Sequence, residues 1–453
     1  MEWHRQGLRE IAQAIRSRKV SAVEVLHYFQ KREQQNRNLN AFVSLNPRAE
    51  DQARAIDAAI ERGENPGVLA GVPIGIKDLI CTAELKTTAG SKMLANFVPT
   101  YDATLVARLK AAGAVVLGKQ NLDEFAMGSS NETSYFGPVR NPWDTNRVPG
   151  GSSGGSAAAQ AAGLVAASIG TDTGGSIRQP ASFCGVVGLK PTYGRVSRYG
   201  VIAYASSLDQ AGPITSTVAD ARLIYETIAG HDPFDATTSR RPVIEPLATQ
   251  TGKPLRVGIV REFSSDGLNG ATGKAFSQAI EVLKAQGAQV TEVSIPLTQL
   301  SIAVYYLISA SEASSNLARY DGVRYGHRAE FEDFSTVDLA SFYAKSRGEG
   351  FGHEVKRRLI LGTYALSAGY QDQYYVKACQ VRRLLALEFA KAFETCDVLI
   401  SPVTTAPAFR LGEKISDPMQ MYLNDVFTTS ANLAGIPAMS VPFALDENRL
   451  PIG

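Results

Sequence analysis

The chain has 453 residues, with 46 Lys or Arg against 44 Asp or Glu, which gives a formal net charge of +2. This near-neutral balance argues against a protein that binds nucleic acid through a basic surface, and an apolar content of 44% argues against intrinsic disorder. At about 150 residues per domain the length allows three domains, but it fits one large α/β unit equally well.

The amino-terminal segment 1–13 carries acidic and basic residues where a secretory signal needs an apolar stretch, and its acids are atypical of a transit peptide. The longest uncharged run, between Arg147 and Asp172, consists largely of Gly, Ala and Ser, which is not the composition of a membrane span. We therefore predict a cytoplasmic protein. The cysteines lie far apart without a C-x-x-C pair, which predicts free thiols and no metal site; they are Cys81, Cys184, Cys379 and Cys396.

The first 65 residues have the pattern of helices. Ser21 followed by Glu24 forms a capping box ahead of an apolar-periodic run. A second helical pattern covers residues 47–63 and ends at Gly63. We expect residues 1–65 to form a helical segment packed on the core.

From Gly71 onward the sequence changes to short apolar runs separated by glycine-containing turns. The runs predict buried strands at 72–76, 114–118 and 165–170, with helices at 103–113 and 155–164 between them. This alternation predicts an α/β sheet with helices on both faces.

A polar, proline-bearing stretch at 231–254 follows this block. It has two interpretations, a domain linker or a surface connection inside one large domain. The segments after it predict strands at 255–260 and 289–295 and a helix starting near Thr272. Because they continue the same α/β pattern, they favour the second interpretation.

Glycine is concentrated in one block, since 16 of the 40 glycines lie between Gly118 and Gly212. Ordered glycine costs backbone entropy, so the concentration indicates tight turns or close ligand approach. Two Gly/Ser segments, 149–158 and 170–180, dominate it. Neither contains the Lys-Ser/Thr of a P-loop or the spacing of a dinucleotide fingerprint, so both indicate serine chemistry.

A serine nucleophile needs a base. Both Ser152 and Ser153 match the pattern G-x-S-x-G, which requires a downstream histidine, yet none of the five histidines lies between residues 28 and 230. The three later histidines leave that route open. Lysine is the other candidate, because a buried lysine can be neutral, and Lys77 directly follows an apolar strand. A solvated surface charge is the ordinary interpretation of a lone lysine, and Asp78 beside it is expected to be a structural partner.

Segments 71–78, 149–159 and 170–200 resemble the core of the amidase signature family, with Lys77, Ser152 and Ser176 at that family's spacing. The resemblance implies one large α/β amidase domain over 66–453, with its signature core at about 71–212 and a mixed central sheet covered by helices on both faces. It implies that Ser176 is acylated and that Ser152, after a cis peptide bond, bridges it to Lys77. Members of the family normally continue beyond the position of Gly453 with a further strand and a helix, and we expect this domain to lack them.

The backbone N–H groups of the loop that ends at Ser176 can converge on a developing oxyanion, because the loop carries little side-chain bulk. They belong to Thr173, Gly174, Gly175 and Ser176.

Segments 121–137, 194–213, 312–326 and 354–375 resemble the A subunits of glutamyl-tRNA(Gln) amidotransferases more than free-standing amidases. The resemblance implies that glutamine is hydrolysed here and that ammonia passes to a B subunit, which amidates Glu-tRNA(Gln) and in some members Asp-tRNA(Asn). It places the tRNA, ATP and Mg²⁺ mainly at the B subunit, no cofactor in this chain, and a small C subunit wrapped over the A–B pair. The alternatives are a stand-alone amidase acting on small carboxamides and a non-enzymatic amidase-like protein.

Glutamine recognition requires a cation for the α-carboxylate and an anion for the α-ammonium group, because an unpaired buried charge is costly. By resemblance these are Arg358, with Arg357 as the neighbouring alternative, and Asp425; a surface ion pair is the ordinary interpretation of both. Further positions that the resemblance places at the substrate are Ser129 and either Tyr305 or Tyr306.

Overall fold

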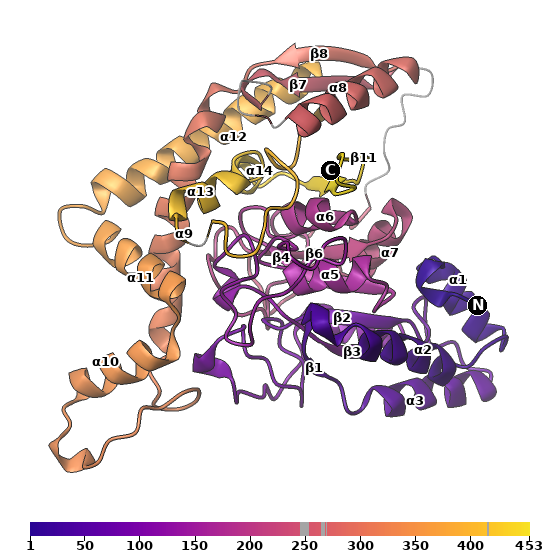
Figure 1. Ribbon diagram of the computed structural model, residues 1–453, viewed down its shortest axis with the longest axis horizontal. Coiled ribbons are helices and arrows are strands. Elements are labelled where there is room, and N and C mark those ends of the chain that lie inside the picture. Colours follow the sequence, from indigo (N-terminus) through magenta and orange to yellow (C-terminus); the bar gives the residue numbers. More distant parts are fainter. Residues whose placement is uncertain (245–252, 264–267, 269, 415) are drawn as a thin grey trace.

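A seven-stranded sheet forms the centre of the protein in this computed structural model (Figure 1). The structure describes residues 1–244, 253–263, 268, 270–414 and 416–453. In sheet order the strands are β1 (Phe42–Leu45), β3 (Val115–Gln120), β2 (Pro73–Lys77), β4 (Ala167–Asp172), β6 (Gln210–Thr215), β5 (Val187–Lys190) and β10 (Ala438–Ser440). Strand β2 pairs in parallel with β3 and β4, whereas the other pairs are antiparallel. The predicted mixed central sheet is therefore confirmed.

The three parallel strands end in polar side chains at the same edge of the sheet. Lys77 is the last residue of β2, Gln120 of β3 and Asp172 of β4, and all three are fully buried. The strands predicted at 114–118 and 165–170 are present but extend two residues further, because ladder pairing continues through these buried polar positions. The carboxyl edge of β2 and β4 is where the candidate site lies.

The amino-terminal part contains the expected helices and one strand. Helices α1 (Leu8–Arg16), α2 (Ala22–Gln35) and α3 (Ala49–Glu61) are present, and the capping box of Ser21 with Glu24 is confirmed. Helix α2 packs against β2 and β3, while β1 adds an edge strand to β3. The segment thus contributes directly to the central layer.

Helices from the rest of the chain cover the sheet and extend from it (Figure 1). The first group packs on the central strands and comprises α5 (Gly154–Ala161), α6 (Arg178–Cys184) and α7 (Val218–Ile228). Helix α4 (Thr104–Ala111) packs against α7, and α14 (Thr429–Ala434) packs against two of the long helices of the second group. A second group projects to one side and comprises α9 (Ser301–Asn316), α10 (Leu339–Gly350), α11 (His353–Ala365), α12 (Lys377–Thr395) and the short α13 (Pro418–Tyr422). In the described part of the chain, no helix has the length and apolar character needed to cross a bilayer.

The strands predicted after the polar stretch do not join the central sheet. They form β7 (Arg256–Val260) and β8 (Gln289–Val293), which build a small parallel sheet with β9 (Val398–Ile400), beside α8 (Gly270–Ala285). Residues 245–252 of the stretch at 231–254 lie outside the described residues. The chain then returns to the central sheet through β10 and ends in the hairpin of β11 (Ala444–Leu445) and β12 (Pro451–Ile452). One α/β domain therefore contains both sheets.

Candidate active site

Lys77 lies in a fully buried environment made of hydroxyl groups. Its Nζ donates hydrogen bonds to Ser152 Oγ at 2.7 Å, Ser153 Oγ at 2.9 Å and Thr171 Oγ1 at 2.9 Å. No carboxylate lies within ion-pair distance of Nζ among the described residues. Burial therefore lowers the pKa of Lys77 to about 7, although more distant carboxylates act in the opposite direction; these belong to Asp123, Asp172 and Asp209.

Ser152 and Ser153 lie in the turn that precedes α5. The peptide bond between Gly151 and Ser152 is cis, as the resemblance implies. A Cβ atom on Gly151 would lie 2.0 Å from Asp123 Oδ2, so this position requires glycine. The N–H of Asp123 donates to the Ser152 carbonyl at 3.2 Å, and the N–H of Ser153 donates to the Ser176 carbonyl at 3.1 Å. The turn is thereby attached to the loop of Ser176.

Ser176 lies on the loop between β4 and α6 and is 7% exposed. A Cβ on Gly174 would lie 2.5 Å from the Tyr305 ring, and a Cβ on Gly175, whose φ is +140°, would lie 2.3 Å from Thr428 Oγ1. Both glycines thus allow close approach of the surrounding chain. Within the described residues the Ser176 hydroxyl makes no hydrogen bond, so its oxygen is available to a substrate.

The amide groups of this loop differ in their partners. The N–H of Gly175 donates to Asp172 Oδ1 at 2.8 Å. The N–H groups of Thr173, Gly174 and Ser176 donate to no group in the described part of the chain. Three of the four predicted oxyanion donors are therefore unengaged, while the amide of Gly175 orients the loop.

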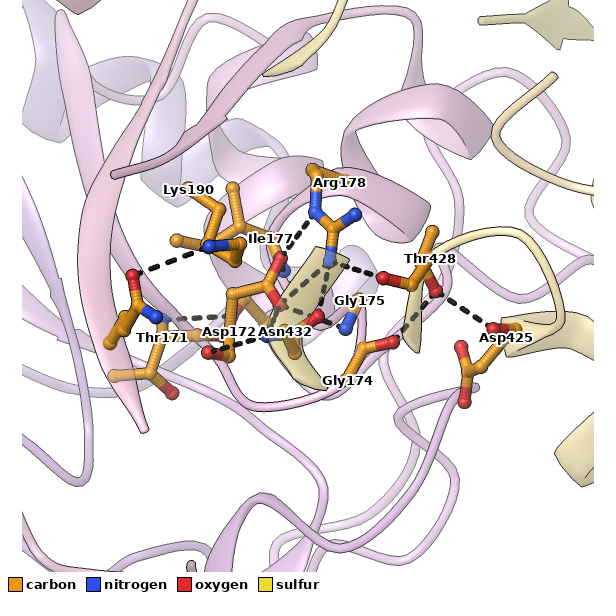
Figure 2. A network of polar contacts seen from close by, with 12 residues as sticks. Thr171, Asp172, Gly174, Gly175, Ile177, Arg178, Lys190, Asp425, Thr428 and Asn432 are labelled. Atoms are coloured by element: carbon orange, nitrogen blue, oxygen red, sulfur yellow. Dashed lines mark hydrogen bonds and ion pairs between the residues drawn. The ribbon is translucent and has the colours of Figure 1, made fainter. Parts of the chain in front are cut away.

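Asp172 holds the loop in place through a buried ion pair (Figure 2). Arg178 donates to both carboxylate oxygens, from Nε at 2.9 Å and from Nη2 at 3.1 Å, and Asn432 Nδ2 donates at 2.8 Å. Burial alone would raise the pKa of Asp172, but Arg178 and these hydrogen bonds lower it to about 2. Thr428 Oγ1 donates to the Gly174 carbonyl at 2.7 Å, which connects the loop to the C-terminal part of the chain.

Arg358 is the buried member of the predicted pair of arginines. It is 3% exposed, whereas Arg357 points outward with its side chain 49% exposed. Arg358 Nε donates to Glu354 at 2.8 Å and Nη1 donates to the Tyr204 hydroxyl at 2.7 Å. Its Nη2 has no hydrogen-bond partner among the described residues. Aromatic rings surround the guanidinium at 5.0 to 5.6 Å; they are those of Tyr204, Tyr306 and Tyr422.

Asp425 lies between Ser129 and the Ser176 loop. Ser129 Oγ donates to Asp425 Oδ2, and Asp425 Oδ1 is 3.4 Å from where a Cβ on Gly175 would be. Burial raises the pKa of Asp425 to about 7, with Ser129 and Arg358 acting in the opposite direction. The carboxylate of Asp425 and the guanidinium of Arg358 are thus both buried near the Ser176 loop, and the positive charge of Arg358 limits the rise in the pKa of Asp425.

The two tyrosines that the sequence left undecided occupy different places. Tyr305 packs against Gly174 of the loop. Tyr306 stacks on Tyr422 with ring centroids 3.8 Å apart and lies 5.0 Å from the Arg358 guanidinium. Tyr305 is therefore nearer to the nucleophile and Tyr306 nearer to the cation.

Several residues with important contacts were missed by sequence reasoning. Asp172 and Arg178 lie on either side of the segment TGGS. Two opposite charges within a glycine-rich block are a local sequence signal that could have predicted their ion pair. The other missed contacts come from distant parts of the chain and carry no local pattern; they involve Thr171, Tyr204, Glu354, Thr428 and Asn432.

The described part of the chain also contains two cavities of different size. A cavity of about 180 Å³ is lined by Arg198, Phe234 and Asp209, whose carboxylate accepts the Thr173 hydroxyl at 2.8 Å. A larger one, of about 400 Å³, lies among the amino-terminal helices. All four cysteines are free, as predicted, and no cluster of His, Cys, Asp or Glu in the described residues has the arrangement of a metal site.

Comparison with known proteins gives full-length matches. A family model described as Amidase matches residues 24–453. The glutamyl-tRNA(Gln) amidotransferase A subunit of Bdellovibrio bacteriovorus is 60% identical over 452 residues, 99% of this chain and 92% of that protein. The protein of the same name from Carboxydothermus hydrogenoformans is 53% identical over 456 residues, covering 100% and 93%. The crystal structure of the glutamyl-tRNA(Gln) amidotransferase A subunit from Thermotoga maritima has a TM-score of 0.80 and 40% identity, over 100% of this chain and 90% of that one.

Proposed function

The chain belongs to the amidase family, and from this premise we propose that it is the glutamine-hydrolysing A subunit of a glutamyl-tRNA(Gln) amidotransferase. The observation that carries the proposal is the buried charge pair beside the Ser176 loop. Arg358 and Asp425 are 3% and 6% exposed, and they offer one cation and one anion. A free amino acid needs both, because each of its backbone charges requires a partner when it leaves water.

We propose that Ser176 is the nucleophile and that Lys77 is the base, acting through Ser152. The Ser153 hydroxyl donates to the Thr171 carbonyl at 3.0 Å, so it can only accept from Lys77. A neutral amine would donate its two hydrogens to Ser153 and Thr171 and keep its lone pair for Ser152 at 2.7 Å. The hydroxyl groups around Lys77 therefore support a neutral base.

The proposed hydrolysis of glutamine proceeds in two stages, through an ester on Ser176. Ser176 Oγ attacks the side-chain amide carbon of glutamine while its proton passes to Ser152 and the Ser152 proton passes to Lys77. The reverse transfer protonates the departing nitrogen, which leaves as ammonia, and a glutamyl ester remains on Ser176. Water attacks this ester with the same proton path and releases glutamate.

We propose that the N–H groups of Thr173, Gly174 and Ser176 stabilise the oxyanion of both tetrahedral intermediates. The amide of Gly175 is already bonded to Asp172, so its role is to hold the loop in shape. Fixed donors of this kind need no rearrangement when charge develops on the substrate oxygen.

For recognition, we propose that Arg358 binds the α-carboxylate through its unpartnered Nη2, and that Asp425, with Ser129, binds the α-ammonium group. The proposed partners are a B subunit, which would hold the tRNA, ATP and Mg²⁺, and a small C subunit, in the cytoplasm.

Glutaminase assays with two classes of substrate test the proposal. The chain, assembled with B and C subunits, should release ammonia from glutamine, and Arg358→Ala should raise KM for glutamine by about 100-fold, in line with the loss of a hydrogen-bonded charge pair. Arg357→Ala is the matched control and should change KM little. Efficient hydrolysis of propionamide by the lone chain, with no preference for glutamine, would instead support the stand-alone amidase.

A further inference from the structure

Glu124 is a buried carboxyl group that the proposed reaction does not use. It is 3% exposed and lies in the short turn that follows Asp123. Its Oε2 accepts the backbone N–H of Gly352 at 2.8 Å, and its Oε1 accepts the hydroxyl of Ser91. Gly352 is the residue immediately before α11, the helix that carries Arg358. A carboxylate of the core therefore binds the amide of the residue that caps the helix of Arg358.

The contact between Glu124 and the helix is close. A Cβ on Gly352 would lie 2.4 Å from Glu124 Oε2, so only glycine lets the backbone approach the carboxylate this closely. The positive end of the helix dipole also favours a carboxylate at this position. Burial raises the pKa of Glu124 to about 7, while Ser91, Gly352 and Lys356 act in the opposite direction.

Other segments near α11 contact the same part of the core. A Cβ on Gly350 would lie 2.5 Å from Met93 Cε, and the N–H of His327 donates to the Met93 carbonyl at 2.7 Å. The end of α10 and the start of α11 therefore rest on two turns of the core, one with Ser91 and Met93 and one with Glu124. Within this contact Glu124 provides the carboxylate that bonds to the start of α11.

We propose that Glu124 is a positioning residue for substrate recognition, which fixes the start of α11 so that Arg358 faces the substrate's α-carboxylate. This inference rests on the proposed function. Arg358 lies six residues after Gly352, about 9 Å along a helix that transmits a shift of its first turn. Glu124 makes no hydrogen bond to Lys77, Ser152 or Ser176, so its loss should weaken substrate binding more than it slows the chemical step.

Steady-state kinetics on the assembled enzyme test the inference. Glu124→Ala should raise KM for glutamine by about tenfold or more and leave kcat within about threefold. Gly352→Ala breaks the same contact from the helix side and should reproduce the split; it also replaces Glu124→Ala if that variant does not fold. Glu124→Gln is the matched control, because its carbonyl oxygen can accept from Gly352 and its amide can donate to Ser91, so KM should stay near the wild-type value.

A double-mutant cycle separates positioning from a general structural role. In the Arg358→Ala background, Glu124→Ala should cause no further increase in KM, since both changes remove the same interaction. Labelling of Ser176 by an uncharged sulfonyl fluoride should be equally fast in wild type and Glu124→Ala. Additive effects on KM, an unchanged KM in Glu124→Ala, or a loss confined to kcat would each overturn the inference. An unchanged KM in Arg358→Ala would instead refute the proposed function.

Discussion

Two lysines of neighbouring strands, Lys77 of β2 and Lys119 of β3, lie in environments that differ in one respect. Both are fully buried, and burial lowers the pKa of Lys77 to about 7 and that of Lys119 to about 8. Lys77 contacts three hydroxyl groups. Lys119 donates to two hydroxyl groups, Thr87 Oγ1 at 2.9 Å and Thr82 Oγ1 at 3.2 Å, but also to the Ile80 carbonyl, and it lies 3.9 Å from Asp78 Oδ1.

The two sets of partners differ in whether their hydrogen bonds to the lysine persist after the lysine loses a proton. A hydroxyl group can accept or donate, so the hydrogen bonds of Lys77 survive its deprotonation. Lys119 also contacts a carbonyl and lies near a carboxylate, which can only accept hydrogen bonds, and these two groups favour its charged form. Burial alone therefore does not turn a lysine into a base. The hydrogen-bond partners decide whether the side chain can exchange a proton, as proposed for Lys77, or remains a structural cation, as expected for Lys119.

The largest expected effect comes from removing the proposed base. Lys77→Ala should lower kcat for glutamine by about 10³-fold or more, because a positioned general base contributes on the order of 10²–10⁴ and the three residues act as a unit. Its midpoint of thermal unfolding should stay near that of the wild type, since no buried carboxylate loses its partner. Retention of more than about a tenth of the activity would contradict a lysine base.

Lys119→Met should have the opposite profile. It leaves Asp78 buried and unpaired, so the free energy of unfolding should fall by about 3–5 kcal/mol in urea titrations. Activity per folded molecule should change little. Adding Asp78→Asn removes the stranded charge and should recover a large part of the stability. A double variant no more stable than Lys119→Met would show that the pair is not what Lys119 provides.

The pH dependence sharpens the comparison further. The pKa of Lys77 lies below its usual value and that of Asp425 above it, both at about 7, so the neutral amine and the carboxylate are both present only above that pH. The value of kcat/KM should therefore fall about 100-fold per pH unit in acid, and about tenfold per unit in Asp425→Asn. The profile should be unchanged in Lys119→Met. A wild-type profile with a single protonation below pH 7 would exclude one of the two groups.

The smallest expected effect concerns one hydroxyl beside Lys77. Ser153→Ala removes an acceptor at 2.9 Å and should slow turnover by about fivefold to tenfold, in line with a net hydrogen-bond contribution of about 1 kcal/mol. Ser156→Ala is a matched control, because Ser156 is equally buried on α5 but makes only a 3.4 Å bond to the Ile169 carbonyl. Equal losses in both variants would point to packing and not to Lys77.

The sequence predicted the α/β fold and placed Lys77, Ser152 and Ser176 in segments that the structure brings together. Periodicity failed where polar side chains continue a buried strand, as at Gln120 and Asp172. It also did not separate β7 and β8 from the central sheet, because apolar runs look alike in both sheets. The contacts of Arg358 with Tyr204 and of Asp172 with Asn432 join parts of the chain more than 150 residues apart, and only the fold reveals them.

The bonds from Thr428 to Gly174 and from Asn432 to Asp172 connect residues separated by 254 and 260 positions. During synthesis the chain emerges from its amino terminus, so Lys77, Ser152 and Ser176 are made long before the segment that holds their loop. The centre therefore becomes complete only after Thr428 and Asn432 have left the ribosome. Nascent chains that stop short of Thr428 would carry all three proposed catalytic residues and still lack an ordered site.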